Sequence, residues 1–140
     1  MGIDAVENVP FEYDAVLGPH DVLVRLTHRS IARGDVQAID DEWGDTRFPL
    51  VPAHQMVGVV ERTGTQVTHP RPGDRVGIGY QLGACFECEY CLRGTEQFCP
   101  RQTVVAVNAY GGLAEHVAVE RVHDDRATVA AGEQRCDAAD

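Results

Sequence analysis

This sequence of 140 residues lacks the features that mark several classes of protein. It has no apolar run that approaches the ~20 residues of a membrane-spanning helix, and its acidic start, MGIDAVENVPFEYD, has no hydrophobic segment typical of a signal peptide. Basic residues are scarce, 12 against 22 acidic ones, so the formal net charge is −10. An acidic surface repels nucleic acid and anionic membranes. We therefore expect a cytoplasmic protein whose partners include no nucleic acid and no membrane.

Two further absences concern enzymatic function. The Gly-x-Gly-x-x-Gly fingerprint of a dinucleotide-binding fold occurs nowhere in the chain. Cysteine is missing before Cys85, and then four of the five cysteines crowd into residues 85–99, at Cys85, Cys88, Cys91 and Cys99. The fifth, Cys136, stands apart near the end of the chain, where a solvated position is the simplest interpretation. The sequence thus offers one dense cluster of thiols and no nucleotide-binding motif.

The spacing of the clustered cysteines predicts a closed metal site. Two interlocked Cys-x-x-Cys steps and a fourth cysteine after a short loop can supply every position of a tetrahedral Zn²⁺. Such a site leaves no vacancy for water or substrate, so its role is structural. Two alternatives stay open: unrelated buried thiols or a disulfide pair, and an iron–sulfur cluster, because Cys99 before Pro100 has some likeness to ferredoxin sequences. Reduced cytoplasmic thiols favour metal binding over disulfides.

Strand signals dominate the rest of the chain. Alternating Val22, Val24 and Leu26 predict a strand within residues 18–27. A short helix capped by Asp35 is expected between residues 28 and 49, since Gly44 and Pro49 would end it. Further strands are predicted at four β-branched segments, 56–60, 75–78, 103–107 and 113–119. We expect a mainly β domain over residues 1–119 with a metal-binding lobe at 85–99, followed by a loosely ordered tail at 120–140.

A second motif lies upstream of the cysteines. The segment Ala53-His54-Gln55 is followed by Gly58, Gly64 and Val67. With the cysteine spacing, GDRVG and GGLAEHVAV, it resembles the zinc-dependent medium-chain alcohol dehydrogenases, most of all the cinnamyl-alcohol type that reduces aldehydes with NADPH. The likeness covers roughly residues 18–119. It implies a GroES-like, partly open barrel from which a four-cysteine structural-zinc lobe protrudes.

The sequence departs from the family at the catalytic zinc site. The family has a zinc-binding cysteine and a proton-relaying hydroxyl in a Cys-His-Ser/Thr-Asp stretch, and here Ala32 and Gly34 stand in their places. The glutamate that follows the family's catalytic histidine is Gln55. The family's third zinc ligand lies in a nucleotide-binding half, which this sequence lacks. The resemblance therefore implies no confident catalytic residue.

Three remnants of that site remain. His54 matches a catalytic zinc ligand, Asp35 matches the carboxylate that orients it, and Arg33 stands where the family contacts the cofactor pyrophosphate. One imidazole holds zinc poorly, so the interpretation as a core histidine in contact with Asp35 is favoured over that as a ligand. For Arg33, a surface arginine is favoured over a cofactor contact.

Two hypotheses about function follow. The first is a truncated or degenerate alcohol dehydrogenase-like domain that binds a structural zinc and is inactive alone, with NADP involved only if a separate nucleotide-binding chain is present. The second is a non-enzymatic zinc-binding module that assembles with other subunits or as a homo-oligomer. The composition changes abruptly at Glu120, to a mixture typical of out-of-frame translation of a GC-rich gene. We interpret this change as a frameshift that ended the protein early.

Overall fold

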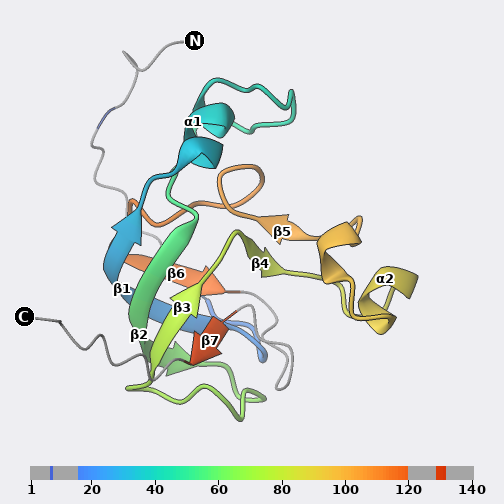
Figure 1. The fold of residues 1–140 in the computed structure, drawn as a ribbon. Coiled ribbons are helices and arrows are strands. Elements are labelled where there is room, and N and C mark those ends of the chain that lie inside the picture. Colours follow the sequence, from blue (N-terminus) through green and yellow to red (C-terminus); the bar gives the residue numbers. More distant parts are fainter. Residues whose placement is uncertain (1–6, 8–15, 120–128, 132–140) are drawn as a thin grey trace, which may run out of the picture.

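The structure, a computed structural model, describes residue 7, residues 16–119 and residues 129–131. Within these ranges the fold is mainly β, as the sequence predicts, and the strands form a curved sheet that does not close into a barrel (Figure 1). The elements in chain order are β1 (Val22–Ser30), α1 (Arg33–Ile39), β2 (Gln55–Thr63), β3 (Arg75–Ile78), β4 (Gln81–Gly83), α2 (Glu89–Leu92), the 3-10 helix η2 (Glu96–Phe98), β5 (Thr103–Val104), β6 (His116–Val119) and β7 (Val129–Ala131). In the described part of the chain, no helix is long and apolar enough to cross a membrane.

Strand β1 lies inside the larger sheet, between β6 and β2. The strand order is β6-β1-β2-β3-β7 and every neighbouring pair is antiparallel. Val24 of β1 pairs with Val60 of β2 on one side and with Val117 of β6 on the other. All three of these valines are buried, because alternate side chains of a strand point to one face. This face forms the core of the domain, together with Met56, Val76, Ile78, Leu82, Val105 and other apolar residues.

The helix begins earlier than the sequence indicates. Ala32, not Asp35, is the N-cap of α1, and Asp35 occupies the third helical position. From there its Oδ2 accepts a hydrogen bond from the backbone N–H of Ala32 at 2.9 Å, which satisfies a donor that the helix itself leaves free. Asp35 therefore caps the helix from inside its first turn, so the predicted capping function is right and its position is wrong.

Two predicted strands are shorter than expected. Residues 103–107 contain only β5, Thr103–Val104, and Val105 then bridges to Ala109 around a turn. The side-chain oxygen of Asn108 accepts a hydrogen bond from Val104 N–H at 2.6 Å, and this contact closes the turn. Likewise β6 begins at His116, because the backbone of Gly111 and Gly112 bonds instead to the carbonyls of Val51 and Ala53.

A separate lobe projects from the sheet beyond the small β4-β5 pair (Figure 1). It contains α2 and η2, which the sequence analysis does not predict, and it has its own buried cluster of Ala84, Cys85, Cys91 and Cys99. The lobe thus has a small core of sulfur atoms, distinct from the apolar core of the sheet.

The predicted loosely ordered tail is described only at residues 129–131. These form β7, which pairs antiparallel with β3, Gly77 opposite Ala130. The edge of β3 offers unpaired backbone groups, so a short apolar segment without any detectable period can complete the ladder. The loosely ordered tail stays a prediction, because the rest of it, including Cys136, lies outside the described residues.

Candidate metal centre

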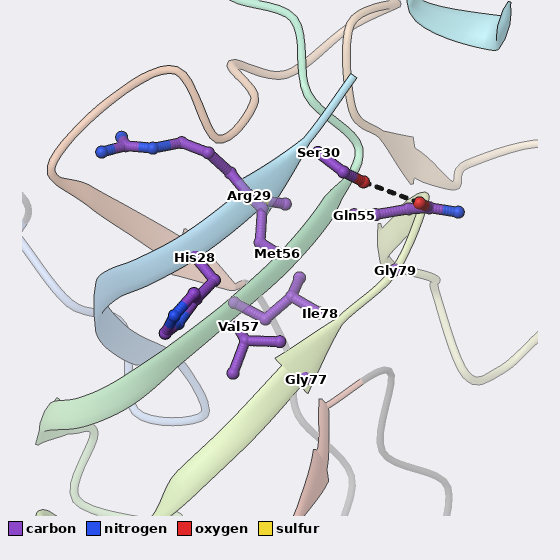
Figure 2. Close-up of a pocket in the computed structure, with 9 residues that line it drawn as sticks. All are labelled: His28, Arg29, Ser30, Gln55, Met56, Val57, Gly77, Ile78 and Gly79. Carbon is purple, nitrogen blue, oxygen red and sulfur yellow. Dashed lines mark hydrogen bonds between the residues drawn. The ribbon is translucent and has the colours of Figure 1, made fainter. Parts of the chain in front are cut away.

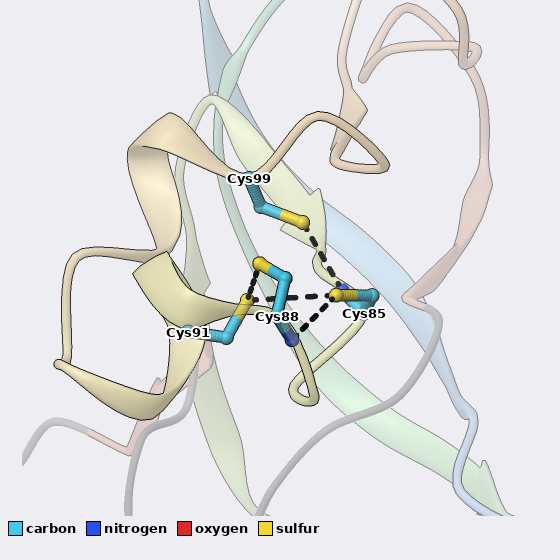
Figure 3. A group of neighbouring side chains, drawn as sticks. All are labelled: Cys85, Cys88, Cys91 and Cys99. Carbon is cyan, nitrogen blue, oxygen red and sulfur yellow. Dashed lines mark hydrogen bonds between the residues drawn. The ribbon is translucent and has the colours of Figure 1, made fainter.

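The four clustered cysteines point their sulfurs at one another (Figure 3). Their Sγ atoms all lie within 4.8 Å of one another, and no other group of three or more potential metal-ligating side chains occurs in the described ranges. Cys88 Sγ and Cys85 Sγ lie 3.5 and 3.9 Å from Cys91 Sγ. Zinc–sulfur bonds of about 2.3 Å in a tetrahedron separate neighbouring sulfurs by about 3.8 Å. The cage therefore fits one tetrahedral ion.

Local backbone structure places each sulfur. Cys85 follows β4, Cys88 is the N-cap of α2, Cys91 lies within α2 and Cys99 ends η2. Backbone N–H groups face the sulfurs: Cys88 N–H donates to Cys85 Sγ at 3.3 Å, and Cys85 N–H donates to Cys99 Sγ at 3.5 Å. Such donors stabilise thiolates, the form of cysteine that binds metal.

The electrostatic environment differs among the four thiols. The backbone N–H of Glu87, helped by that of Cys88, lowers the pKa of Cys85 to about 6. Burial raises the pKa of Cys91 to about 12, because a charge deep in the lobe loses its hydration. A bound cation would supply the charge that lets all four sulfurs ionise together.

The alternatives to a single metal ion fit this cage less well. None of the four cysteines forms a disulfide, and sulfur separations of 3.5 and 3.9 Å are far longer than a disulfide bond of about 2.05 Å. An iron–sulfur cluster places its own iron and sulfide atoms between the cysteine sulfurs and so needs a wider cage. The donor set and its size favour one mononuclear ion.

His54 and Asp35 meet in the structure, as the sequence predicts. His54 Nδ1 lies 3.0 Å from Asp35 Oδ2, and the Asp35 side chain is completely buried. Asp35 Oδ1 also accepts a hydrogen bond from Ala53 N–H at 2.8 Å, so one carboxylate positions both the histidine ring and the backbone before it. His54 belongs to no group of potential metal ligands in the described residues.

The surroundings of His54 show the effect of the departures from the family at positions 32 and 34. A Cβ atom on Gly34 would lie 3.3 Å from His54 Cε1, so position 34 faces the imidazole directly. Ala32 lies next to this spot, at the start of α1, and offers no ligand atom. The Arg33 side chain is exposed and makes no hydrogen bond or ion pair with another described residue. The site thus keeps an oriented histidine and lacks the groups that would share a metal with it.

Tyr80 is a neighbour of His54 that the sequence analysis missed. Its ring meets the imidazole edge-on, with centroids 5.9 Å apart and an interplanar angle of 88°. Partial burial and the nearby charge of Asp45 raise the pKa of Tyr80, so its phenol stays protonated at neutral pH. Tyr80, five positions before Cys85, belongs to no sequence motif, and only the fold brings its ring next to His54.

Gln55, the other departure from the family, lines an open pocket of about 480 Å³ (Figure 2). The pocket lies between residues 28–30, 55–57 and 77–79, on the strands β1, β2 and β3. Ser30 Oγ donates a hydrogen bond to Gln55 Oε1 at 2.8 Å, and the pair forms a neutral polar rim beside apolar side chains. The Gln55 side chain therefore contacts Ser30, whereas its chain neighbour His54 contacts Asp35.

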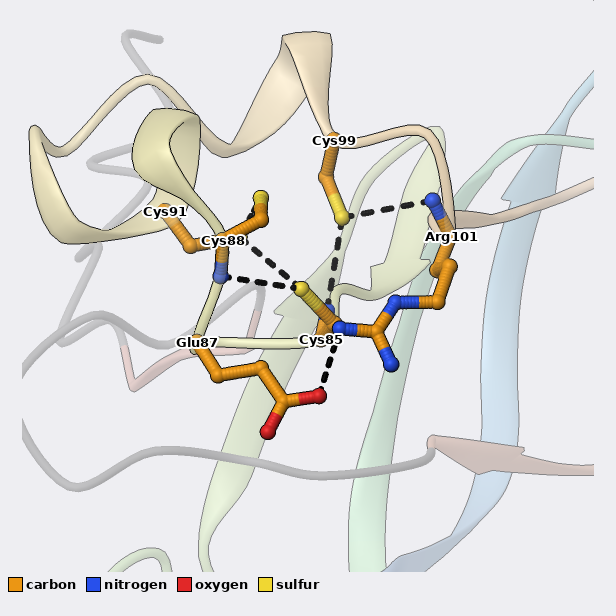
Figure 4. Close-up of polar contacts among 6 residues, drawn as sticks. All are labelled: Cys85, Glu87, Cys88, Cys91, Cys99 and Arg101. Carbon is orange, nitrogen blue, oxygen red and sulfur yellow. Dashed lines mark hydrogen bonds and ion pairs between the residues drawn. The ribbon is translucent and has the colours of Figure 1, made fainter.

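A charged pair beside the cysteines was also missed. Arg101 Nη2 and Glu87 Oε1 lie 2.5 Å apart, and Figure 4 shows the guanidinium next to Cys85. Opposite charges at the two ends of the cysteine segment are visible in the sequence. Nothing in the spacing of Glu87 and Arg101, however, indicates that they meet.

Comparison with known proteins agrees with this geometry. Residues 18–127 match the family model of the alcohol dehydrogenase GroES-like domain, and this match extends beyond the domain boundary expected at residue 119. A probable formaldehyde dehydrogenase, AdhA, of Bacillus subtilis is 42% identical over 111 residues, which are 74% of this chain and 32% of that protein. The NADP-dependent alcohol dehydrogenase C of Mycobacterium bovis is 40% identical over 94 residues, 67% of this chain and 27% of that protein.

Solved structures give the same result. A cinnamyl alcohol dehydrogenase from Sorghum bicolor superposes with a TM-score of 0.72 at 31% identity, covering 79% of this chain and 34% of that one. The chain thus spans about a third of the length of the relatives it matches. The strands, the open barrel and the cysteine lobe are those that the resemblance predicts. Since the matched region covers most of its residues, the chain belongs to the family of GroES-like domains of zinc-type alcohol dehydrogenases.

Proposed function

We propose that this chain is the N-terminal domain of a zinc-type alcohol dehydrogenase, that its four cysteines hold one structural zinc, and that the 140-residue chain alone does not catalyse the family's reaction. The observation that carries the proposal is the convergence of the four sulfurs within 4.8 Å. A zinc bound there is fully ligated by protein, so its chemistry is to hold the lobe together. We assign residues 1–119 to the domain and residues 85–99 to the zinc lobe.

The lack of dehydrogenase activity follows from the residues around His54. The reaction needs a Lewis acid at the substrate oxygen, a proton relay and a bound nicotinamide. Here Ala32 and Gly34 offer neither a metal ligand nor a hydroxyl, and His54 is held by Asp35 without a second ligand in the described residues. NADP is the nicotinamide we propose for a complete assembly, because relatives are named as NADP-dependent or as complexed with NADP(H).

The direct test is an activity assay on the zinc-loaded chain. We expect no oxidation of alcohols and no reduction of aldehydes with either nicotinamide cofactor. The double variant Ala32→Cys, Gly34→Ser should stay inactive, because it restores a ligand and a hydroxyl but no nucleotide site. Cofactor-dependent turnover by the unmodified chain would refute the proposal.

A non-enzymatic, zinc-binding subunit is the second candidate, and the same two residues, Ala32 and Gly34, favour it. The two candidates differ in what the partner supplies. A separate chain that carries Gly-x-Gly-x-x-Gly and that restores NADPH oxidation on mixing would support the dehydrogenase domain. A stable zinc-loaded complex, hetero- or homo-oligomeric, without nucleotide binding would support the subunit.

A further inference from the structure

One side of the cysteine lobe carries a charged pair whose position is unusual. Glu87 lies between the first two cysteines and Arg101 follows the last, and their side chains meet at 2.5 Å over the cluster (Figure 4). The two side chains are 65% and 59% exposed. Exposed ion pairs contribute little to folding. Folding stability therefore does not explain why this pair sits against the sulfurs.

Arg101 contacts the cysteine cluster in two ways. Its backbone N–H donates to Cys99 Sγ at 3.4 Å. Its guanidinium lies beside Cys85, and the Glu87 carboxylate, followed by the Cys85 sulfur, raises the pKa of Arg101. The backbone N–H of Glu87 hydrogen-bonds to Cys85 as well. Both members of the charged pair thus act on the same sulfur.

The position of Arg101 matters because a zinc-loaded centre is negatively charged. Four thiolates around a divalent cation carry a net charge of about −2. A guanidinium beside one sulfur stabilises that charge by Coulomb attraction and by hydrogen bonding, as outer residues do at other metal sites. The lobe's other arginine, Arg93, also pairs with a glutamate, Glu89 at 2.7 Å, but on the surface of α2.

We propose that Arg101 is a positioning residue of the metal centre: held in place by Glu87, it covers the Cys85 sulfur and slows the release of zinc. This inference rests on the proposed function, since it requires that the four cysteines bind zinc. It adds that the rate of zinc release is controlled by a salt bridge between two residues that are not metal ligands.

The test follows transfer of zinc from the loaded full-length chain to an excess of a chromogenic chelator at fixed pH. Replacing Arg101→Gln should speed zinc release by about tenfold, the lower end of the effects seen for residues outside the ligand set. Arg101→Lys keeps the positive charge but lacks the planar guanidinium. Its zinc release rate should therefore lie between those of the unmodified chain and of Arg101→Gln. Glu87→Gln should also speed zinc release, because the Arg101 guanidinium loses the carboxylate that holds it over the Cys85 sulfur.

Arg93→Gln is the matched control. It removes the same charge from an arginine that is 69% exposed on the same lobe, and its release rate should stay close to that of the unmodified chain. A second readout separates a local effect from a general loss of stability. In the cobalt(II)-substituted protein, Arg101→Gln should shift the thiolate-to-metal charge-transfer band, whereas Arg93→Gln should not.

The outcomes are distinguishable. An unmodified chain that binds no metal would overturn the proposed function, and this inference with it. An unmodified chain that holds zinc, together with Arg101→Gln and Arg93→Gln variants that release it at equal rates, would overturn the inference alone. Faster release in Arg101→Gln with partial rescue by Arg101→Lys would support it.

Discussion

Asp35 is the buried charged residue of the described structure, and its side chain is completely inaccessible. A buried carboxylate is costly unless its oxygens are hydrogen-bonded. Here they accept from the backbone N–H groups of Ala32 and Ala53, at 2.9 and 2.8 Å, and Oδ2 faces His54 Nδ1 at 3.0 Å. Asp35 thus joins the start of α1 to the segment that precedes β2.

We predict that Asp35→Asn lowers the free energy of unfolding by about 3 kcal/mol, because an amide cannot accept from both backbone donors with equal strength. Chemical denaturation of the two proteins measures the difference. The matched control is Asp74→Asn, whose carboxylate accepts from Arg71 N–H at 2.8 Å on the exposed surface. That substitution should change stability by less than about 1 kcal/mol. Equal losses in the two variants would contradict the role given to Asp35.

The contact between Asp35 and His54 was predictable from the sequence, but the environment of the pair was not. The two residues stand at positions that the family uses for a histidine and its orienting carboxylate. The edge-on ring of Tyr80, however, arrives from a segment more distant in the chain. Its arrival depends on how β3 leads into β4, which no local pattern specifies.

At the scale of elements, Gly58 shows how closely β1 and β2 approach. A Cβ atom at Gly58 would lie 2.5 Å from the carbonyl oxygen of Arg25 in β1. The glycine is therefore required by the close contact between two neighbouring strands.

We predict that Gly58→Ala destabilises the domain by at least about 2 kcal/mol, since backbone atoms must move to admit the methyl group. Gly79→Ala is the control, because a Cβ atom there meets nothing within 4 Å. It should be neutral or slightly stabilising, by less than about 1 kcal/mol. Thermal unfolding of both variants gives the comparison, and an unaffected Gly58→Ala domain would show that the strands are farther apart than described.

The cysteine lobe and the sheet should respond differently to metal removal. Their buried clusters share no residue. We predict that a strong chelator increases hydrogen exchange of the amides of residues 85–99 by at least about tenfold, because metal-binding free energy is folding free energy there. Amides of β1 and β2 should keep their protection, and added zinc should restore that of the lobe. Loss of protection in the central strands would mean that the two parts unfold together.

Strand positions illustrate where sequence reasoning ends. Alternating Val22, Val24 and Leu26 located β1, since a half-buried strand leaves a period of two, and a β-branched segment located β3. The short strands β4 and β7 carry no such period, and each exists because a neighbouring strand offers backbone partners. Cys-x-x-Cys spacing located the metal ligands, but not the pairing of Glu87 with Arg101.

At the scale of the whole molecule, the chain spans about a third of the length of its dehydrogenase relatives. Its two candidate metal sites, around His54 and at the four cysteines, differ in the ligands that they offer. His54, just before β2, stands at the position of the family's catalytic histidine and is oriented by Asp35, but it has no shared metal ligand in the described residues. The lobe keeps its complete four-cysteine cage. We therefore propose that the lobe binds metal and that the sheet does not.

The zinc content of the purified chain tests this claim most directly. Elemental analysis should find one zinc per chain, and the value should stay at one in His54→Ala and in Cys136→Ser, because neither residue is among the four proposed ligands. Cys99→Ser should hold markedly less zinc, because one of the four ligands is lost. A second zinc that disappears in His54→Ala, or an unchanged zinc content in Cys99→Ser, would contradict the account.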